Sequence, residues 1–199
     1  VVTGVSGSGK TTMVLESLVP ALEAKTNGSA LPAHIREIRA EGIAHVKLID
    51  ATPIGINVRS TVATYAGVHD ELRKLYARSP DARQKGFKAS DFSYNTGSLR
   101  CPGCDGTGEV NLDVQFLPDV NIVCPDCRGS RYARAAYGVK LTNEAEQAVS
   151  LPQLMDMDVN SALAFCGGMK TVSQRLQTLQ QLGLGYLTLG EETPSLSGG

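Results

Sequence analysis

Residues Cys101–Arg131 have the sequence CPGCDGTGEVNLDVQFLPDVNIVCPDCRGSR, with a Cys-x-x-Cys pair near each end. The two pairs are separated by 19 residues, and each continues as Cys-x-x-Cys-x-Gly. Zn²⁺ binds four thiolates at tetrahedral corners, and one Cys-x-x-Cys turn supplies two of them. The repeat predicts two copies of one knuckle, folded face to face around zinc, with the ligands Cys101, Cys104, Cys124 and Cys127.

The residues between the two pairs predict a β-hairpin. Glu109–Gln115 and Val120–Val123 alternate apolar and polar side chains, and Leu117-Pro118-Asp119 is typical of a turn. Two disulfides or an iron–sulfur cluster are the alternative uses of four such cysteines. No stretch resembles a secretory signal peptide, so nothing favours an oxidising compartment, and the spacing favours zinc. The fifth cysteine, Cys166, follows an apolar run and is predicted to be a buried small hydrophobe.

Charge is unevenly distributed along the chain, although the net value is −1. Residues 71–100 carry seven Lys or Arg against three acids, and residues 128–140 carry four basic residues and no acid. The stretch 101–127 carries five acids and no Lys or Arg. Basic flanks beside a zinc module favour a polyanionic partner. The candidate contacts to it are Arg83, Lys85, Lys88, Arg100, Arg128, Arg131 and Arg134.

Composition excludes two function classes. Hydrophobic residues make up 42% of the chain, and no run approaches the length of a membrane span, so no membrane partner is expected. Aromatic residues make up 5% and Trp is absent, which disfavours a large base-stacking surface.

A phosphate-binding loop (P-loop) opens the chain. Gly4–Thr11, GVSGSGKT, fits G-x-x-x-x-G-K-[ST] at every position and follows the expected strand Val1–Thr3. Glycines let successive backbone N–H groups face phosphate oxygens, Lys10 reaches the β- and γ-phosphates, and the Thr11 hydroxyl binds Mg²⁺. The sequence predicts ATP and Mg²⁺ as ligands, held by Gly4, Ser6, Gly7, Ser8, Gly9, Lys10, Thr11 and Thr12.

Further short elements are expected along the chain. A helix from Thr11 should stop at Pro20, and a second strand, His45–Ile49, ends at Asp50, followed by Ala51 rather than an acid. Helices are predicted at Asp70–Arg78, Leu151–Met155, Val159–Phe165 (with Asp158 as N-cap) and Thr171–Leu182. The last helix has a row of core residues: Val172, Leu176, Leu179 and Leu182. The histidines His34, His45 and His69 are interpreted as ordinary surface or strand residues.

The last four residues are Leu196-Ser197-Gly198-Gly199. Alone this tetrapeptide is weak evidence, but its position after a complete P-loop makes it informative. With the P-loop, the paired cysteines and this tetrapeptide in that order, the chain resembles the second nucleotide-binding half of the UvrA family, the ABC-type damage-recognition ATPases of bacterial nucleotide excision repair. The resemblance runs nearly end to end and includes Ile49–Gly55, Ala63–Gly67, Asp91–Asn95, Phe116–Asp119, Arg131-Tyr132, Leu176–Leu179 and Gly183–Tyr186.

The resemblance implies an ABC-type ATPase in which ATP lies between the P-loop of one half and the Leu-Ser-Gly-Gly signature of another. Ser197, Gly198 and Gly199 would then bind nucleotide held by another lobe. It further implies a homodimer of the full-length protein, a UvrB-type partner and a cytoplasmic location. It also implies binding of double-stranded DNA, aided by the zinc module, so the basic residues named above are the candidate DNA contacts. Two departures from the family pattern, at Ala51 and at Ile56–Val62, suggest a divergent paralogue.

The chain is expected to be a fragment, because the resemblance places the Walker B carboxylates after Gly199. No catalytic residue is assigned, and this chain alone is expected to hydrolyse essentially no ATP.

The predicted fold is an α/β P-loop NTPase lobe of ABC type, in part, at residues 1–69. It is followed by an α+β signature region at 70–199, which carries the zinc-bound β-hairpin with its four cysteine ligands at about 98–137. Three alternatives stay open: a UvrA-like protein of drug self-resistance, a small P-loop kinase with Asp50 as metal ligand, and a zinc interaction module similar to that of the DnaJ chaperones.

Overall fold

The computed structural model describes residues 1–49, 57, 59–112 and 120–196. Two compact units, Val1–Thr52 and Pro53–Gly199, make up the chain, and each is described by itself. Within the described ranges, no helix combines the length and the apolar character needed to cross a bilayer. The predictions for Asp50, Ala51, the turn Leu117–Asp119 and the residues Ser197–Gly199 lie outside the described residues.

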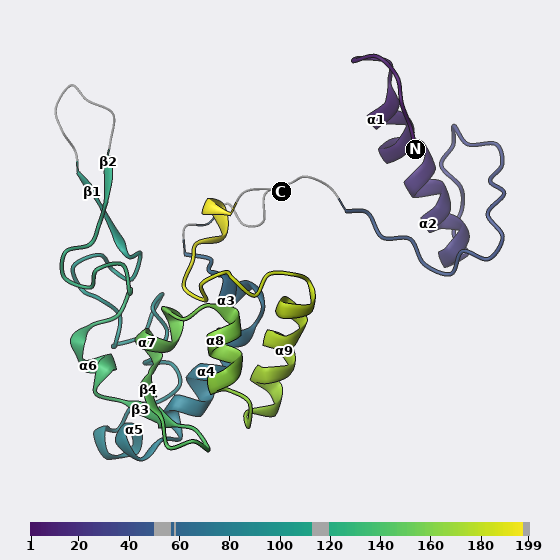
Figure 1. The fold of residues 1–199 in the computed structure, drawn as a ribbon. Coiled ribbons are helices and arrows are strands. Elements are labelled where there is room, and N and C mark those ends of the chain that lie inside the picture. Colours follow the sequence, from purple (N-terminus) through teal and green to yellow (C-terminus); the bar gives the residue numbers. More distant parts are fainter. Residues whose placement is uncertain (50–56, 58, 113–119, 197–199) are drawn as a thin grey trace. The chain divides into compact units, whose positions relative to one another are not determined.

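The first unit carries one run of helical residues (Figure 1). Helix α1 (Lys10–Thr12), the π-helix η1 (Met13–Leu18) and α2 (Val19–Asn27) follow one another directly. The predicted stop at Pro20 is wrong, because Pro20 lies in the first turn of α2, where a missing N–H is tolerated. Helix α2 ends instead at Gly28, whose φ of 69° is left-handed.

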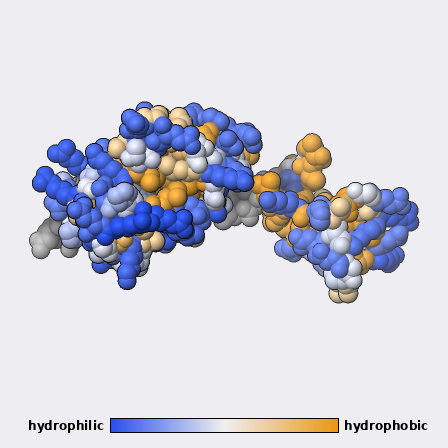
Figure 2. All heavy atoms as spheres, turned by 90° about the horizontal axis from the view of Figure 1, so that it is seen from below, coloured by the Kyte–Doolittle hydropathy of each residue, from blue (hydrophilic) through white to orange (hydrophobic). Residues whose placement is uncertain are grey.

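The two strands expected in this unit do not form, since none of its described residues belongs to a β-strand. A strand needs a hydrogen-bonded neighbour, and the described part of this unit provides none. Apolar side chains also reach its surface (Figure 2): Val5, Met13, Leu15 and Leu18 are 41–79% exposed. The described part of this unit, residues 1–49, thus shows the P-loop and its helix without a sheet.

The second unit is an α+β body with two separate antiparallel hairpins. Strand β1 (Glu109–Leu112) pairs with β2 (Val120–Val123), and β3 (Lys140–Thr142) pairs with β4 (Ala148–Ser150). In the first hairpin Glu109 lies opposite Val123 and Leu112 opposite Val120, which confirms the predicted hairpin over its described residues. The first hairpin projects from the helical part of this unit (Figure 1).

The helices of this unit are α3 (Val62–Tyr65), α4 (Val68–Ala77), α5 (Pro80–Lys85), α6 (Arg134–Tyr137), α7 (Leu151–Met155), α8 (Val159–Phe165), α9 (Lys170–Gln181) and the 3-10 helix η2 (Thr193–Ser195). The predicted bounds of α7 and α8 are confirmed, and Asp158 caps α8 by accepting the Ser161 N–H at 2.9 Å. The prediction for Leu182 is wrong: it follows α9 and is 68% exposed, whereas Val172 and Leu176 are buried.

The largest fully buried side chains of the second unit are aromatic. Tyr76, Phe92, Tyr94 and Tyr132 are buried, and the rings of Tyr94 and Tyr132 meet edge to face. His69 lies among them with 4% exposure, and its Nε2 is 2.7 Å from the Tyr132 hydroxyl. The interpretation of His69 as a surface or strand residue is therefore wrong. Its place in α4 shows why, because residues 69, 72 and 76 share one helix face.

We expect His69 to make the fold sensitive to acid. Burial, aided by the charge of Arg73, lowers the pKa of His69 from 6.5 to about 3. Between these values the unfolded chain binds a proton that the folded chain does not, so the free energy of unfolding should fall as pH falls from about 6.5 toward 3. Urea unfolding at several pH values should show a smaller decline for His69→Gln than for the wild type.

The matched control is His45→Gln, which replaces an exposed histidine of the other unit and should decline in parallel with the wild type. Parallel curves for His69→Gln and the wild type would contradict the assignment of His69 as a buried neutral residue.

Candidate metal centre

Four cysteine sulfur atoms meet at the base of the first hairpin. The Sγ atoms of Cys101, Cys104, Cys124 and Cys127 all lie within 4.8 Å of one another, and all four residues are buried. Cys101 Sγ is 3.9 Å from Cys124 Sγ, and Cys104 Sγ is 3.6 Å from Cys127 Sγ. Zinc–sulfur bonds of about 2.3 Å in a tetrahedron require sulfur atoms about 3.8 Å apart, so the cluster fits Zn²⁺. The same distances are far too long for disulfides.

The two cysteine pairs belong to two copies of one backbone motif, as the sequence repeat predicts. We call Cys101–Gly108 the first knuckle and Cys124–Arg131 the second. Immediately after its second cysteine, each knuckle has two successive residues with positive φ: Asp105 and Gly106 at 50° and 78°, and Arg128 and Gly129 at 53° and 84°. In both, the N–H three residues after that cysteine donates to its carbonyl oxygen at 3.1 Å.

Backbone hydrogen bonds also join the two knuckles reciprocally. The N–H of Cys101 donates to the Arg131 carbonyl at 2.9 Å, and the N–H of Cys124 donates to the Gly108 carbonyl at 2.9 Å. Below them, the Ala133 N–H donates to the Leu99 carbonyl at 2.9 Å. We call residues 99–133 the metal module. Its first and last residues lie side by side and are joined by backbone hydrogen bonds.

The environment of the sulfur atoms changes their protonation. Burial raises the pKa of Cys101, and it raises that of Cys127 to about 12. Burial alone would also raise the pKa of Cys104, but the N–H of Gly108, 3.3 Å from its Sγ, and the neighbouring thiols lower it below its ordinary value. Four buried thiolates need a cation beside them, and a bound metal ion would displace the thiol protons.

Most of the predicted DNA-contact residues lie on the surface of the second unit. Arg83, Lys85, Lys88, Arg128 and Arg134 are exposed. Besides Arg131, two candidates have protein partners: Lys85 Nζ donates to the Gly138 carbonyl at 2.6 Å, and Arg100 pairs with Asp105 at 2.9 Å. Both contacts are at the surface and can exchange with phosphate at little cost.

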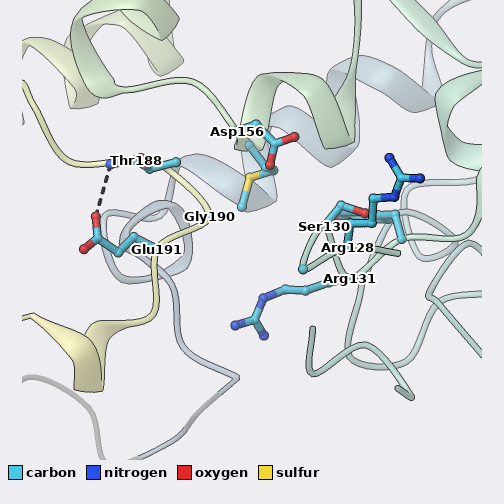
Figure 3. Close-up of a pocket in the computed structure, with 10 residues that line it drawn as sticks. Arg128, Ser130, Arg131, Asp156, Thr188, Gly190 and Glu191 are labelled. Carbon is cyan, nitrogen blue, oxygen red and sulfur yellow. Dashed lines mark hydrogen bonds between the residues drawn. The ribbon is translucent and has the colours of Figure 1, made fainter. Parts of the chain in front are cut away.

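Arg131 differs from the other candidates. It is 3% exposed, and its Nη2 lies 2.5 Å from Glu192 Oε1. In Figure 3 its side chain extends toward the C-terminal segment that carries Glu191, whereas the neighbouring Arg128 points away from it. A buried guanidinium paired in this way cannot reach a phosphate of a DNA duplex. We therefore correct the sequence-based interpretation and leave Arg131 out of the proposed DNA contacts.

The P-loop residues form a compact turn in the first unit. Gly7 and Gly9 have φ of 78° and 81°, and helix α1 begins directly after Gly9. The Lys10 ammonium donates to the carbonyls of Gly4 at 2.8 Å and Val5 at 2.6 Å. Lys10 therefore already lies over the loop to which the sequence assigns phosphate binding.

No family model matches the chain, but several known proteins resemble it over its whole length. It is 42% identical over 200 residues to the UvrABC system protein A of Clostridium acetobutylicum and 39% identical over 206 residues to that of Thermus thermophilus. Each match covers 100% of this chain but 21% and 20% of the relative, so the chain spans about a fifth of the length of these curated relatives.

A solved structure resembles the same chain. The crystal structure of UvrA2 from Deinococcus radiodurans superimposes with a TM-score of 0.79 at 36% identity, covering 98% of this chain and 23% of that one. The likeness is therefore not limited to the cysteines or to the P-loop.

We predict one Zn²⁺ per chain, held by the four clustered thiolates. Cys124→Ser should lose most of the metal, because a serine hydroxyl is a poor zinc ligand, and metal analysis of the purified chain measures this directly. Cys166→Ala is the matched control: Cys166 is buried in the helical core away from the cluster and should not affect zinc content. Full zinc content in Cys124→Ser would contradict the assignment.

Proposed function

Because this chain belongs to the UvrA family, we propose that it is part of an ATP-binding, zinc-containing, DNA-binding protein that recognises damage in nucleotide excision repair. The observation that carries the proposal is the match over the whole chain. The two relatives named above are 42% and 39% identical to it, and the solved structure is 36% identical with a TM-score of 0.79. The clustered cysteines and the P-loop add independent chemical support.

The metal is proposed to have a structural role. All four ligand positions of a tetrahedral site are filled by cysteine, which leaves no open position for water or substrate. Zinc would hold the two knuckles together and thereby fix the hairpin β1–β2 and the basic residues beside it. Because binding free energy is folding free energy in so small a module, chelation should loosen residues 99–133 before it affects the helices.

Nucleotide is proposed to bind at the P-loop. Backbone N–H groups of Gly4–Gly9 and the hydroxyl of Thr11 would hold phosphate and Mg²⁺, and Lys10 would exchange its bonds to the Gly4 and Val5 carbonyls for phosphate oxygens. ATP hydrolysis is a property proposed for the longer protein, with Ser197, Gly198 and Gly199 serving nucleotide on another lobe. The homodimer, the UvrB-type partner and the cytoplasmic location belong to the same proposal.

The alternative functions receive less support. If the chain were a small P-loop kinase, it should match the UvrABC relatives only in the first unit. If it were a DnaJ-like zinc module, it should match them only around the cysteines. The matches to the UvrABC system proteins A instead cover 100% of the chain. No structural observation favours drug self-resistance over repair.

DNA contacts are proposed for the exposed basic residues on the two flanks of the metal module. Arg128 and Arg134 follow the second cysteine pair, and Arg83, Lys85, Lys88 and Arg100, whose side chain is 38% exposed, precede the first. Contacts of this type go to phosphates and are independent of sequence.

We predict that replacing Arg128 and Arg134 together with Ala weakens duplex binding and flattens its salt dependence. Each lost phosphate contact lowers the slope of log K against log salt by about 0.9, so the slope should fall by up to about 2. Fluorescence anisotropy with a labelled duplex, titrated at several salt concentrations, measures both quantities. Arg36→Ala with Lys47→Ala removes the same charge from exposed positions of the first unit and should leave the slope unchanged. An unchanged slope in the first variant would move the contacts to residues 83–88.

We predict that Lys10→Ala weakens ATP binding about 10- to 100-fold, the loss expected when a charge-assisted hydrogen bond to phosphate is removed. Isothermal titration with Mg²⁺ and a non-hydrolysable ATP analogue measures the affinity. Lys25→Ala, at an exposed position of α2, is the control. Equal affinities for Lys10→Ala and the wild type would remove the P-loop from the proposal.

A further inference from the structure

Arg131 occupies the position that the first knuckle fills with a glycine. The two knuckles align with an offset of 23 residues, which matches Cys101 with Cys124 and Gly108 with Arg131. Both residues have positive φ, 85° for Gly108 and 70° for Arg131. Glycine adopts this backbone conformation readily, whereas a residue with a side chain does so at a cost. The metal motif by itself therefore favours glycine at 131, and the arginine needs another explanation.

The side chain of Arg131 supplies that explanation. Its guanidinium pairs with Glu192, lies over the Tyr94 ring at 5.3 Å from the centroid, and donates to the Gly106 carbonyl at 3.4 Å. The side chain of Arg131 is 4% exposed and that of Glu192 is 25% exposed. Shielding from water strengthens the attraction between the two charges but costs them their hydration, so the pair depends on both partners, and removing one leaves the other charge buried and unpaired.

Glu192 belongs to a segment that is bonded to another part of the chain. Glu192 forms a β-bridge with Thr61, the Val62 N–H donates to the Glu191 carbonyl at 3.0 Å, and the Thr193 N–H donates to the Ser60 carbonyl at 3.0 Å. The hydroxyl of Tyr94, beneath the Arg131 guanidinium, donates to the Arg59 carbonyl at 3.1 Å. Arg131 thus contacts the place where residues 59–62 and 191–193 lie side by side.

Arg131 is also tied to the metal module by its own backbone. Its carbonyl accepts a hydrogen bond from the Cys101 N–H at 2.9 Å. Its own N–H donates a hydrogen bond to the sulfur of Cys127. One residue therefore connects two of the metal-ligand positions to the segment 188–196, which leads in sequence into Ser197-Gly198-Gly199.

We propose that Arg131 is a positioning residue that couples zinc in the four-cysteine site to the order of residues 188–196, through its ion pair with Glu192. When zinc holds the second knuckle, the Arg131 backbone is fixed and its guanidinium holds Glu192. When the knuckle loosens, the ion pair is lost and the segment before the signature residues becomes more mobile. The inference rests on the proposed function, in that zinc must occupy the cysteines and the last residues must serve as the signature.

Hydrogen exchange of the zinc-loaded and the chelated chain, read at residues 188–196, tests the proposal. In the wild type, chelation should speed exchange in this segment by about tenfold or more, the factor that one charge-assisted hydrogen bond supplies. Two variants should show the fast rate even when loaded with zinc. Arg131→Gly gives the second knuckle the glycine that the first knuckle has at the equivalent position. Glu192→Gln removes the partner charge and leaves the second knuckle unchanged. Both should retain one zinc per chain by metal analysis.

Arg128→Gly is the matched control, because it also replaces an arginine at positive φ in the second knuckle but with a side chain that points away from the C-terminal segment (Figure 3). It should respond to chelation as the wild type does. If residues 188–196 of zinc-loaded Arg131→Gly exchange as slowly as those of the wild type, the proposal is overturned. It is also overturned if chelation leaves the exchange rate of this segment unchanged in the wild type. A wild type that binds no zinc would instead overturn the metal assignment and this coupling with it.

Discussion

Four buried sulfur atoms within 4.8 Å of one another are the constraint on which the second unit depends. They belong to segments 23 residues apart, and bringing them together fixes the two knuckles, their reciprocal backbone bonds and the base of the hairpin β1–β2. The hairpin has little packing of its own, since every residue of β2 is exposed. A short two-stranded ribbon of this kind is marginal in water, so its order comes from the metal module beneath it.

The same constraint sorts the basic residues into different roles. Arg128, Arg131 and Arg134 are spaced three apart and are equivalent in sequence, yet Arg128 and Arg134 are exposed and Arg131 is buried. The difference arises because the knuckle turns the backbone between them through positive φ values. The surface residues can act on a polyanion through counterion release, whereas the buried one acts inside the protein.

Local patterns in the sequence predicted the cysteine cluster, the hairpin and the bounds of α7 and α8, because each depends on a few adjacent residues. The prediction of two strands in the first unit was wrong. A strand needs hydrogen bonds from a neighbouring strand, and no local pattern reveals whether that neighbour is present. The burial of His69 and Arg131 was missed for a similar reason, since tertiary contacts decide it. A signal existed for His69, because Leu72 and Tyr76 follow it on the same helix face.

The comparison of Gly108 with Arg131 separates what the metal requires from what the rest of the protein requires. Both knuckles make the same turn-closing bond and the same bond to the other knuckle, so either residue can serve the metal module, and glycine does so with less backbone strain. The first knuckle lacks a side chain at this position. At the second, the backbone cost is offset by contacts with Glu192 and Tyr94 that lie outside the module. Strain that a local motif does not need points to a function beyond that motif, and here those contacts lead to the segment 188–196.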